Sequence, residues 1–576
     1  MKAKTLLAAA LAATAFGARA DFSIDLDIGT KPIKDVRTST CGPEIGYAGT
    51  LASLQDWGLD EEFLFGEDAE NTARLMKEAG AWLQRMWSAN AWFAKRDTVH
   101  PKTGKKGSNP KLVFDFWKKY GFKVLFTLEA WGGESARTNI NEFVDFIIAN
   151  DYKDVVAGFE LGNETYFAKT YPDLAPIWTK IVFDLAKKWP GVKLGIPLCE
   201  YFDKNPDLTQ VRGRMLGNGE IKTTDYFSTR VFSRYSAKYV VAMAESGALK
   251  HITHVIYHAY GAETPYSCSY YGFERFRNFT VAFPELKGKN FWLTEIRPRS
   301  DEDNRCQRIF RETLIMAHYA QTAICQPDMD GYNHHQIHCI SGGLYQSVPR
   351  GNARQSSWQV QWQDAGGEFP DYRTLGKLRM EVGHAGVMYR IYAEAIKSHP
   401  LVMHHGTSRE MNTTNSFYTS ANVCDQVYAR RRALKEGRRK DAPKVAGEVE
   451  WTALLDANRS DLCLLMVNSR NEPETVRLTV KGRQFAAPVY RTLTCPEKYV
   501  DCREVPCDGK AWRQVSWEDT QSGYDVVAME KYDGMKPSCD SLEITIEPHT
   551  VQAVNVAMRK AVDRVAKWGG GENIGK

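Results

Sequence analysis

The chain lacks the features that mark several large classes of protein. Beyond its first 20 residues, no apolar stretch approaches the ~20 residues that cross a bilayer as a helix. Its twelve cysteines include no Cys-x-x-Cys pair, the spacing typical of structural zinc sites. Lys and Arg number 75 against 70 Asp and Glu, and a net charge of +5 is too small to indicate nucleic-acid binding. We therefore predict no membrane span, no nucleic-acid partner and no cofactor.

The first 20 residues are typical of a secretory signal peptide. A basic start is followed by an uncharged run, Thr5–Phe16, and by Ala18-Arg19-Ala20, a small-x-small cleavage site. We expect cleavage after Ala20 and a secreted or periplasmic protein. The cysteines can form disulfides in that setting, but their spacing does not determine which of them pair.

Residues 40–398 alternate short apolar runs with longer stretches of helical periodicity, which is the pattern of βα units around a parallel sheet. The eight runs are Pro43–Ala48, Trp82–Trp87, Lys123–Leu128, Val155–Leu161, Val192–Leu198, Ile252–Tyr257, Asn290–Thr294 and Met329–Gln336. The last helical stretch, Arg373–Lys397, is long and amphipathic. Eight strands, each followed by a helix, predict a (β/α)8 TIM barrel.

The pattern changes after about residue 400, where short segments alternate polar with apolar residues. Leu542–Ile546 is an example, and such alternation predicts strands with one buried face. Phe22–Ile28 alternates in the same way. We therefore expect residues 21–39 and 399–558 to form an antiparallel β-sandwich, and residues 559–576 to be a flexible tail.

Two carboxylates end predicted barrel strands. Glu164 follows the fourth run and Glu295 follows the seventh. The active site of a TIM barrel lies at the carboxyl ends of its strands, and glycoside hydrolysis uses two carboxyl groups that face each other across a sugar. Either glutamate alone could cap a helix or pair with an arginine. Two at these positions favour catalysis.

The residues around both glutamates resemble the motifs of one clan of enzymes. Residues 159–164, Phe-Glu-Leu-Gly-Asn-Glu, resemble the acid/base motif of the clan A (β/α)8 retaining glycosidases. That clan includes α-L-arabinofuranosidases, β-xylosidases and heparanase-like β-glucuronidases. Residues 292–295, Trp-Leu-Thr-Glu, resemble the nucleophile motif of the same clan. The resemblance implies that Glu164 is the acid/base, that Glu295 is the nucleophile, and that Asn163 donates to the sugar 2-hydroxyl. Glu164 is not followed by the Pro of several relatives, and no single family is indicated.

Several other polar residues end predicted strands. Arg85 ends the second run, where it would lower the pKa of Glu295 and fix its orientation. His258 and Tyr260 resemble clan positions that contact the nucleophile or the sugar. Glu129 and Glu160 are further carboxylates of the strand ends, and we expect them behind the catalytic pair.

Aromatic and histidine residues of the strand ends have two interpretations each. Trp87, Trp92 and Trp131 could stack on sugar rings or simply pack in the barrel. His334 belongs to the run Asn333-His334-His335-Gln336-Ile337-His338, whose side chains alternate between two faces of a strand. A substrate contact by His334 is therefore favoured over a zinc site, and no metal is predicted.

Together these patterns predict an exported retaining glycoside hydrolase whose partner is a carbohydrate. Two alternatives fit the same residues: a catalytically silent glycan-binding protein on this fold, and an inverting glycosidase. The basic residues near Glu295 are compatible with an anionic sugar, and the motifs fit neutral sugars equally well. Nothing in the sequence indicates linkage, exo or endo cleavage, or oligomeric state.

Overall fold

The computed structural model of the 576-residue chain describes most of the predicted elements. The described residues are 20–38, 46–48, 61–67, 69–78, 80, 82–99, 101, 106–164, 174–198, 234–260, 284–297, 310–335, 345–347, 380–382, 384–408, 449–486, 488–495, 505–507, 511–513 and 540–560. The predicted signal peptide, except for Ala20, lies outside them, as does the predicted tail beyond Lys560.

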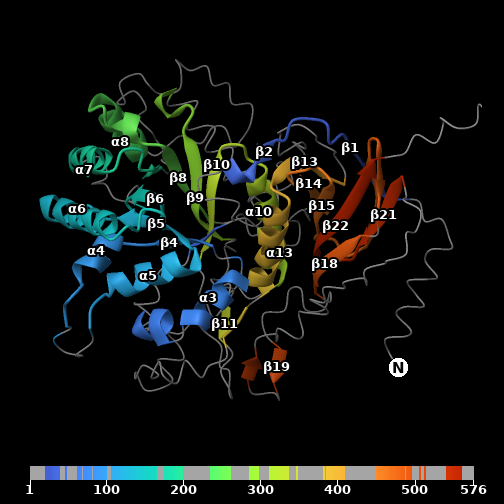
Figure 1. Ribbon diagram of the computed structural model, residues 1–576, viewed down its shortest axis with the longest axis horizontal. Helices are drawn as coiled ribbons and strands as arrows, with labels where there is room; N and C mark the ends of the chain where they lie inside the picture. The colour runs from blue at the N-terminus through green and yellow to red at the C-terminus, as the bar shows by residue number, and fades with distance from the viewer. Residues whose placement is uncertain are drawn as a thin grey trace, which may run out of the picture.

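Eight parallel strands close into a barrel, in the order β10-β3-β4-β5-β6-β7-β8-β9 (Figure 1). They are β3 (Gly46–Ala48), β4 (Leu83–Met86), β5 (Lys123–Leu128), β6 (Val156–Leu161), β7 (Leu194–Pro197), β8 (His254–Tyr260), β9 (Asn290–Arg297) and β10 (Met329–His335). Each strand coincides with or overlaps one of the eight predicted runs. The predicted (β/α)8 barrel is therefore confirmed.

Helices surround the barrel and connect its strands (Figure 1). They are α3 (Ala69–Glu78), α4 (Ala89–Ala94), α5 (Pro110–Tyr120), α6 (Glu134–Ala149), α7 (Ala175–Lys188), α8 (Arg234–Glu245), α10 (Phe310–Ile324) and α13 (His384–Ser398), with a π-helical turn, η2 (Phe63–Glu67), and 3₁₀ turns η1 (Val36–Thr38), η7 (Ala248–His251) and η8 (Pro284–Leu286). Local sequence sets the ends of α5: the Asn109 side chain accepts from the Leu112 amide, Pro110 occupies the first turn, and Gly121 ends the helix at φ 77°.

The last predicted helix begins later than expected. Residues 380–382 of the predicted stretch form a short strand, β12 (Met380–Val382), which pairs antiparallel with β11 (Tyr345–Ser347). Helix α13 begins at His384 and ends at Ser398. The helical interpretation of residues 380–382 is therefore wrong, because their backbone pairs with a distant segment.

The layer of the barrel interior that lies farther from the carboxyl ends of the strands is apolar. Five side chains pack together there: Leu83, Leu125, Ala157, Ile256 and Trp292. Gly158 is required beside them, since a Cβ at this position would lie 2.3 Å from the ring of Trp292. Strand residues alternate in direction, so the positions two residues after Leu83, Leu125, Gly158, Ile256 and Trp292 also face inward, closer to the carboxyl ends.

A β-sandwich accompanies the barrel (Figure 1, right). One sheet has three strands, β1 (Phe22–Leu26), β16 (Glu474–Val480) and β21 (Ser541–Ile546); the other has seven, β2 (Lys34–Asp35), β13 (Leu401–Thr407), β14 (Val449–Leu455), β15 (Asp461–Asn468), β17 (Arg483–Phe485), β18 (Val489–Thr494) and β22 (Thr550–Lys560). A further hairpin joins β19 (Val505–Cys507) and β20 (Ala511–Arg513). Strand β1, from the segment before the barrel, pairs in parallel with β16, whereas the other described strand pairs of the two sheets are antiparallel. The exact domain limits stay a prediction, and β22 continues two residues past residue 558.

Helices α10 and α13 lie between the barrel strands and the sandwich and contact β14, β15 and β22 (Figure 1). A buried polar network crosses this contact. Glu450 of β14 bonds His318 of α10, and His405 Nε2 of β13 lies 3.0 Å from Glu450 Oε1. Ser469 Oγ lies 2.7 Å from His318 Nε2. Polar groups rather than apolar side chains alone therefore join the two parts of the molecule.

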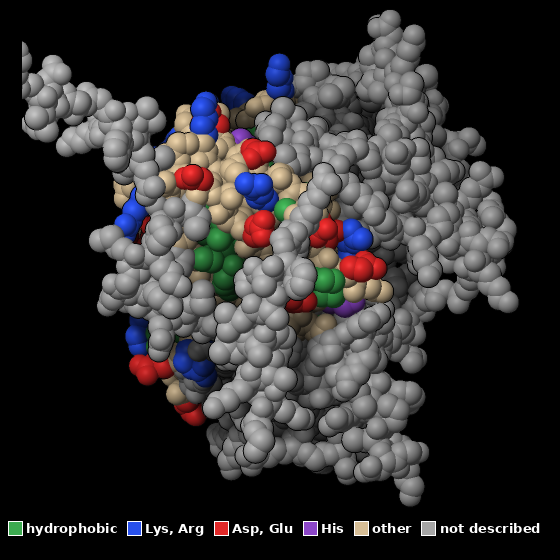
Figure 2. Space-filling model, turned by 90° about the vertical axis from the view of Figure 1, so that its right-hand side faces the viewer, with side chains coloured by type: hydrophobic (Ala, Val, Ile, Leu, Met, Phe, Trp, Pro, Cys, Tyr) green, Lys and Arg blue, Asp and Glu red, His purple; other side chains and the backbone are tan. Residues whose placement is uncertain are grey.

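The surface carries charges of both signs. Figure 2 shows the face on the sandwich side, where Lys, Arg, Asp and Glu side chains are interspersed around small apolar areas. Within the described ranges, no helix is both long and apolar enough to cross a bilayer.

Candidate active site

The carboxyl end of β6 positions Glu164. Strand β6 is buried, and the chain turns sharply just after it at Gly162, whose φ is 100°. Glu164 itself has a φ of 47°, in the left-handed region that non-glycine residues rarely adopt. Such backbone strain persists only where the surrounding structure requires it, and it is concentrated at functional sites. The predicted acid/base residue is therefore held in a strained turn.

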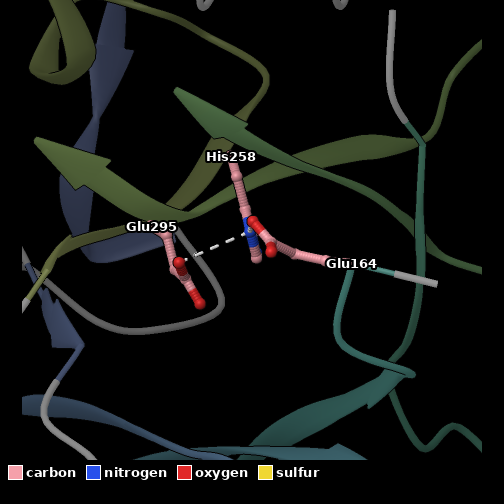
Figure 3. A group of neighbouring side chains, drawn as sticks. All are labelled: Glu164, His258 and Glu295. Atoms are coloured by element: carbon pink, nitrogen blue, oxygen red, sulfur yellow. Dashed lines mark hydrogen bonds and ion pairs between the residues drawn. The ribbon is translucent and has the colours of Figure 1, made fainter. Parts of the chain in front are cut away.

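Neighbouring strands place His258 beside Glu295. Strands β8 and β9 pair in parallel with His258 opposite Glu295, after a register shift at Tyr257. His258 Nδ1 lies 3.0 Å from Glu164 Oε1 and 3.5 Å from Glu295 Oε2. Figure 3 shows the imidazole between the two carboxylates, with Glu164 arriving from the opposite side. One ligand atom from each of the three residues lies within 4.8 Å of the other two.

Arg85 at the end of β4 joins three of the site residues. Its Nη1 donates to Glu295 Oε1 at 2.5 Å, its Nε donates to Glu160 Oε2 at 2.6 Å, and its Nη2 donates to Asn163 Oδ1 at 2.8 Å. The guanidinium is fully buried. The predicted contact between Arg85 and Glu295 is present, and it extends to the residue that precedes Glu164.

The net pKa shift of Glu295 differs from the one expected of an arginine neighbour. Burial raises the pKa of the Glu295 carboxyl, and the charges of His258 and Arg85 lower it by less. The pKa of Glu295 therefore lies above its usual value, although Arg85 by itself lowers that pKa, as expected.

Glu160 is the second carboxylate bound to Arg85. Burial would raise its pKa, but the charge of Arg85 and the contact with His258 lower the pKa to about 2. Burial would also lower the pKa of His258, but Glu295, Glu160 and Glu164 together raise it to about 9. At neutral pH the site therefore holds two buried cations, Arg85 and His258.

Glu129 lies at the end of β5 beside this cluster. Asn90 fixes its backbone, since the Asn90 side chain donates to the Glu129 carbonyl at 3.0 Å and accepts from its amide at 2.8 Å. Ser88 Oγ lies 3.4 Å from its carboxylate. Burial is the main cause that raises the pKa of Glu129 to about 7. Its expected place behind Glu164 and Glu295 stays a prediction.

No protein-family model matches the chain, and no curated protein matches it. Solved structures, however, match the chain in fold. An α-L-arabinofuranosidase from Thermotoga maritima, solved with arabinose, is 12% identical over 93% of this chain and 100% of that chain, with a TM-score of 0.55. A family 51 α-L-arabinofuranosidase from Bifidobacterium longum is 11% identical over 94% and 100% of the two chains, with a TM-score of 0.52. This chain shares the fold of those arabinofuranosidases.

The aromatic candidates are in different surroundings. Trp131 is 53% exposed, and Trp87 is half-buried with its ring centroid 5.8 Å from Arg85 Cζ. Trp92 is buried and donates from Nε1 to Glu61 Oε1 at 2.7 Å, so it is a core residue and not a stacking surface. The backbones of Tyr260 and His334 lie near the carboxyl ends of β8 and β10, and their side chains lie outside the described part of the structure.

Sequence reasoning missed two threonines of the site. Thr127 Oγ1 donates to Glu160 Oε2 at 2.9 Å, and Thr294 Oγ1 lies 3.1 Å from His258 Nε2. Both are polar residues at inward positions of otherwise apolar strands, two residues after Leu125 and Trp292. That alternation is the signal that would have found them.

Among the described side chains, Glu164, His258 and Glu295 are the one group of metal-ligating type gathered closely enough to hold an ion. A hydrogen bond between His258 and Glu164 already accounts for their approach. The neighbouring guanidinium of Arg85 would also repel a cation. The arrangement is therefore that of a hydrogen-bonded cluster, and the predicted lack of a metal stays a prediction.

Proposed function

We propose that the protein is an exported retaining glycoside hydrolase, with Glu295 as the nucleophile and Glu164 as the general acid/base. The spacing of the two carboxylates supports this most directly. One oxygen of each carboxylate lies within 4.8 Å of the other, which is compatible with the ~5 to 5.5 Å between the carboxyl groups of retaining enzymes. An inverting enzyme needs ~6.5 to 9.5 Å, because a water molecule must fit between its carboxylate and the sugar.

The first step forms a bond between Glu295 and the anomeric carbon. Arg85 binds Oε1 of Glu295, so Oε2 is the oxygen that attacks. The bond from the anomeric carbon to the leaving oxygen breaks, and Glu164 gives that oxygen its proton. The leaving group departs as an alcohol, and a glycosyl ester of Glu295 remains.

The second step reverses these roles. A water molecule gives a proton to Glu164 while its oxygen attacks the anomeric carbon, and Glu295 leaves as a carboxylate. Two inversions give a product of retained configuration.

Charge in the buried cluster favours this change of role. In the resting site, Arg85 and His258 balance the negative charges of Glu160 and Glu295. When Glu295 becomes a neutral ester, one positive charge is left uncompensated. A nearby positive charge favours Glu164 as a carboxylate, which is the form that accepts the proton of water.

The side-chain amide of Asn163 can donate a hydrogen bond to a substrate. Its Oδ1 accepts from Arg85 Nη2, which orients the amide so that Nδ2 is the group able to donate to the sugar 2-hydroxyl. The signal-like residues 1–20 support export. The structural neighbours make an α-L-arabinofuranoside the first substrate to test.

The test is turnover of a panel of 4-nitrophenyl glycosides: α-L-arabinofuranoside, β-D-xyloside, β-D-glucuronide and β-D-galactoside. We expect nitrophenol release from at least one, with retained configuration in the first product seen by proton NMR. Glu164→Ala should keep activity on the activated aryl glycoside, and azide should accelerate it. Inverted product would contradict the proposal, and a folded protein silent on this panel and on polysaccharides would favour the glycan-binding alternative.

A further inference from the structure

A polar layer fills the barrel just beneath the two catalytic carboxylates. Its members lie above the apolar layer around Trp292 and come from five strands. They are Arg85 of β4, Thr127 of β5, Glu160 of β6, and His258 of β8 with Thr294 of β9 beside it, and all are buried. Charged groups are rarely placed in a barrel interior, because desolvation is costly unless each is paired.

Glu160 is the member of this layer that contacts all the others. Its Oε2 accepts from Arg85 Nε at 2.6 Å and from Thr127 Oγ1 at 2.9 Å. Its Oε1 accepts from Thr294 Oγ1 at 3.4 Å and lies 3.6 Å from His258 Nε2. The side chain is 0% exposed. With both oxygens engaged and no exposed surface, Glu160 is not a group that touches a substrate.

The partners of Glu160 are the groups that hold the catalytic carboxylates. Arg85 donates to Glu160 through Nε and to Glu295 and Asn163 through its two terminal nitrogens. His258 faces Glu160 through Nε2 and faces Glu164 and Glu295 through Nδ1. Glu160 therefore stands behind both cations, on the side away from the reacting carboxylates.

A buried negative charge at this place affects every titratable group around it. Those groups are Arg85 and His258, the proposed nucleophile Glu295, and Glu129 on the neighbouring strand. Removal of a proton beside a negative charge is harder for a carboxylic acid and for an imidazolium alike. The charge of Glu160 thus acts on all of them in one direction.

We propose that Glu160 is a positioning residue whose buried charge holds Arg85 and His258 against the two catalytic carboxylates and sets the pH range in which the enzyme works. This inference rests on the proposed function. Glu160 forms no bond to substrate, and its effect reaches the reaction through its two cationic partners.

The test is the pH profile of kcat/KM for Glu160→Gln, measured with the nitrophenyl glycoside that the wild type cleaves. Gln keeps the shape and loses the charge, so the pKa of each neighbouring group falls. We expect both limbs of the profile to move to lower pH, by about one unit. Glu160→Asp keeps the charge, and its limbs should stay near those of the wild type even where kcat drops.

A matched control is Thr127→Val, which removes a hydrogen bond to Glu160 and leaves its charge. This variant should move neither limb of the pH profile by more than a few tenths of a pH unit. If Glu160→Gln lowers kcat and its limbs coincide with those of the wild type, or move to higher pH, the inference is overturned and Glu160 is only a packing residue.

Loss of folding in Glu160→Gln would not remove the test. Arg85→Gln is then compared with Arg85→Gln/Glu160→Gln, in which Glu160 is no longer a buried charge without its guanidinium, and the double variant must have its limbs at lower pH than Arg85→Gln. Nitrogen-15 NMR of the His258 ring gives a readout without turnover, and its titration should fall to lower pH in Glu160→Gln. A wild type that cleaves no glycoside would contradict the proposed function, whereas an unshifted His258 titration would contradict only this inference.

Discussion

Arg85 Nη1 lies 2.5 Å from Glu295 Oε1, and both side chains are buried. The same guanidinium donates to Asn163, the residue before Glu164. One side chain from the second barrel strand therefore fixes the proposed nucleophile and the segment of the proposed acid/base. A planar fork with several donors can make these contacts at once, and an ammonium group cannot.

Arg85→Lys should reduce kcat/KM by about 100-fold or more. Lysine retains the positive charge but cannot bond Glu295, Glu160 and Asn163 together, and a displacement of about 1 Å at a reacting group has effects of this size. Steady-state kinetics at the pH optimum measures the change.

The matched control is Arg137→Lys. Arg137 makes a comparable two-point contact with Asp184, through Nε at 2.6 Å and Nη2 at 3.0 Å, but at the surface. Its kcat/KM should equal that of the wild type. An Arg85→Lys enzyme whose kcat/KM is within threefold of the wild-type value would contradict the role assigned to the guanidinium of Arg85.

The polar network between α10 and the sandwich should dominate the stability of their contact. Glu450→Gln leaves His318 and His405 buried without their carboxylate, and breaking such a buried pair costs about 3 to 5 kcal/mol of unfolding free energy. Urea unfolding followed by circular dichroism measures it. Glu394→Gln removes two ion pairs between partly exposed side chains, with Arg390 at 2.9 Å and with Arg491 at 3.4 Å, and should cost less than about 1 kcal/mol.

The stability difference between wild type and Glu450→Gln should depend on pH. Burial raises the pKa of Glu450, but His318 and His405 lower it to about 2, so its contribution is present above pH 4.5 and is lost as pH falls through 2. Burial lowers the pKa of His405, but Cys325 and Glu450 raise it to about 10, so its contribution is present below pH 6.5 and is lost as pH rises through 10. We expect the largest difference between these limits. A difference that grows toward pH 2 or pH 10 would contradict the pairing.

Trp131→Ala should weaken substrate binding with little effect on folding. The ring is 53% exposed at the carboxyl end of β5, where a sugar could stack on it. We expect KM for an oligosaccharide to rise roughly fivefold, the equivalent of about 1 kcal/mol, with an unchanged melting temperature. Val99→Ala, at another exposed apolar residue, is the control. An unchanged KM would make Trp131 an ordinary surface residue.

The strands of the barrel could be predicted because parallel strands buried on both faces are nearly continuous apolar runs. Lys123–Leu128 has the same limits in the sequence and in the structure. The start of helix α6 at Glu134 could not be predicted in the same way, since its first turns are polar and carry no hydrophobic periodicity. Strand β12 was missed because pairing with a distant segment leaves no local signal.

The two catalytic candidates and Arg85 could also be predicted, because strand ends meet at the barrel mouth. Glu160 was also expected behind them, but its partners could not be predicted. A glutamate within an apolar strand is compatible with many environments, and its pairing with Arg85 and His258 depends on how three strands meet in the barrel. Three-dimensional contact, not spacing, distinguishes it from Glu164.

The most direct test of the account is the identity of the residue that becomes glycosylated. The protein is treated with a 2-deoxy-2-fluoro glycosyl fluoride of the sugar that it cleaves, digested, and sequenced by mass spectrometry. The account predicts one added fluoroglycosyl group, on Glu295, and none in Glu295→Gln. A label on Glu164, Glu160 or any other residue would contradict it.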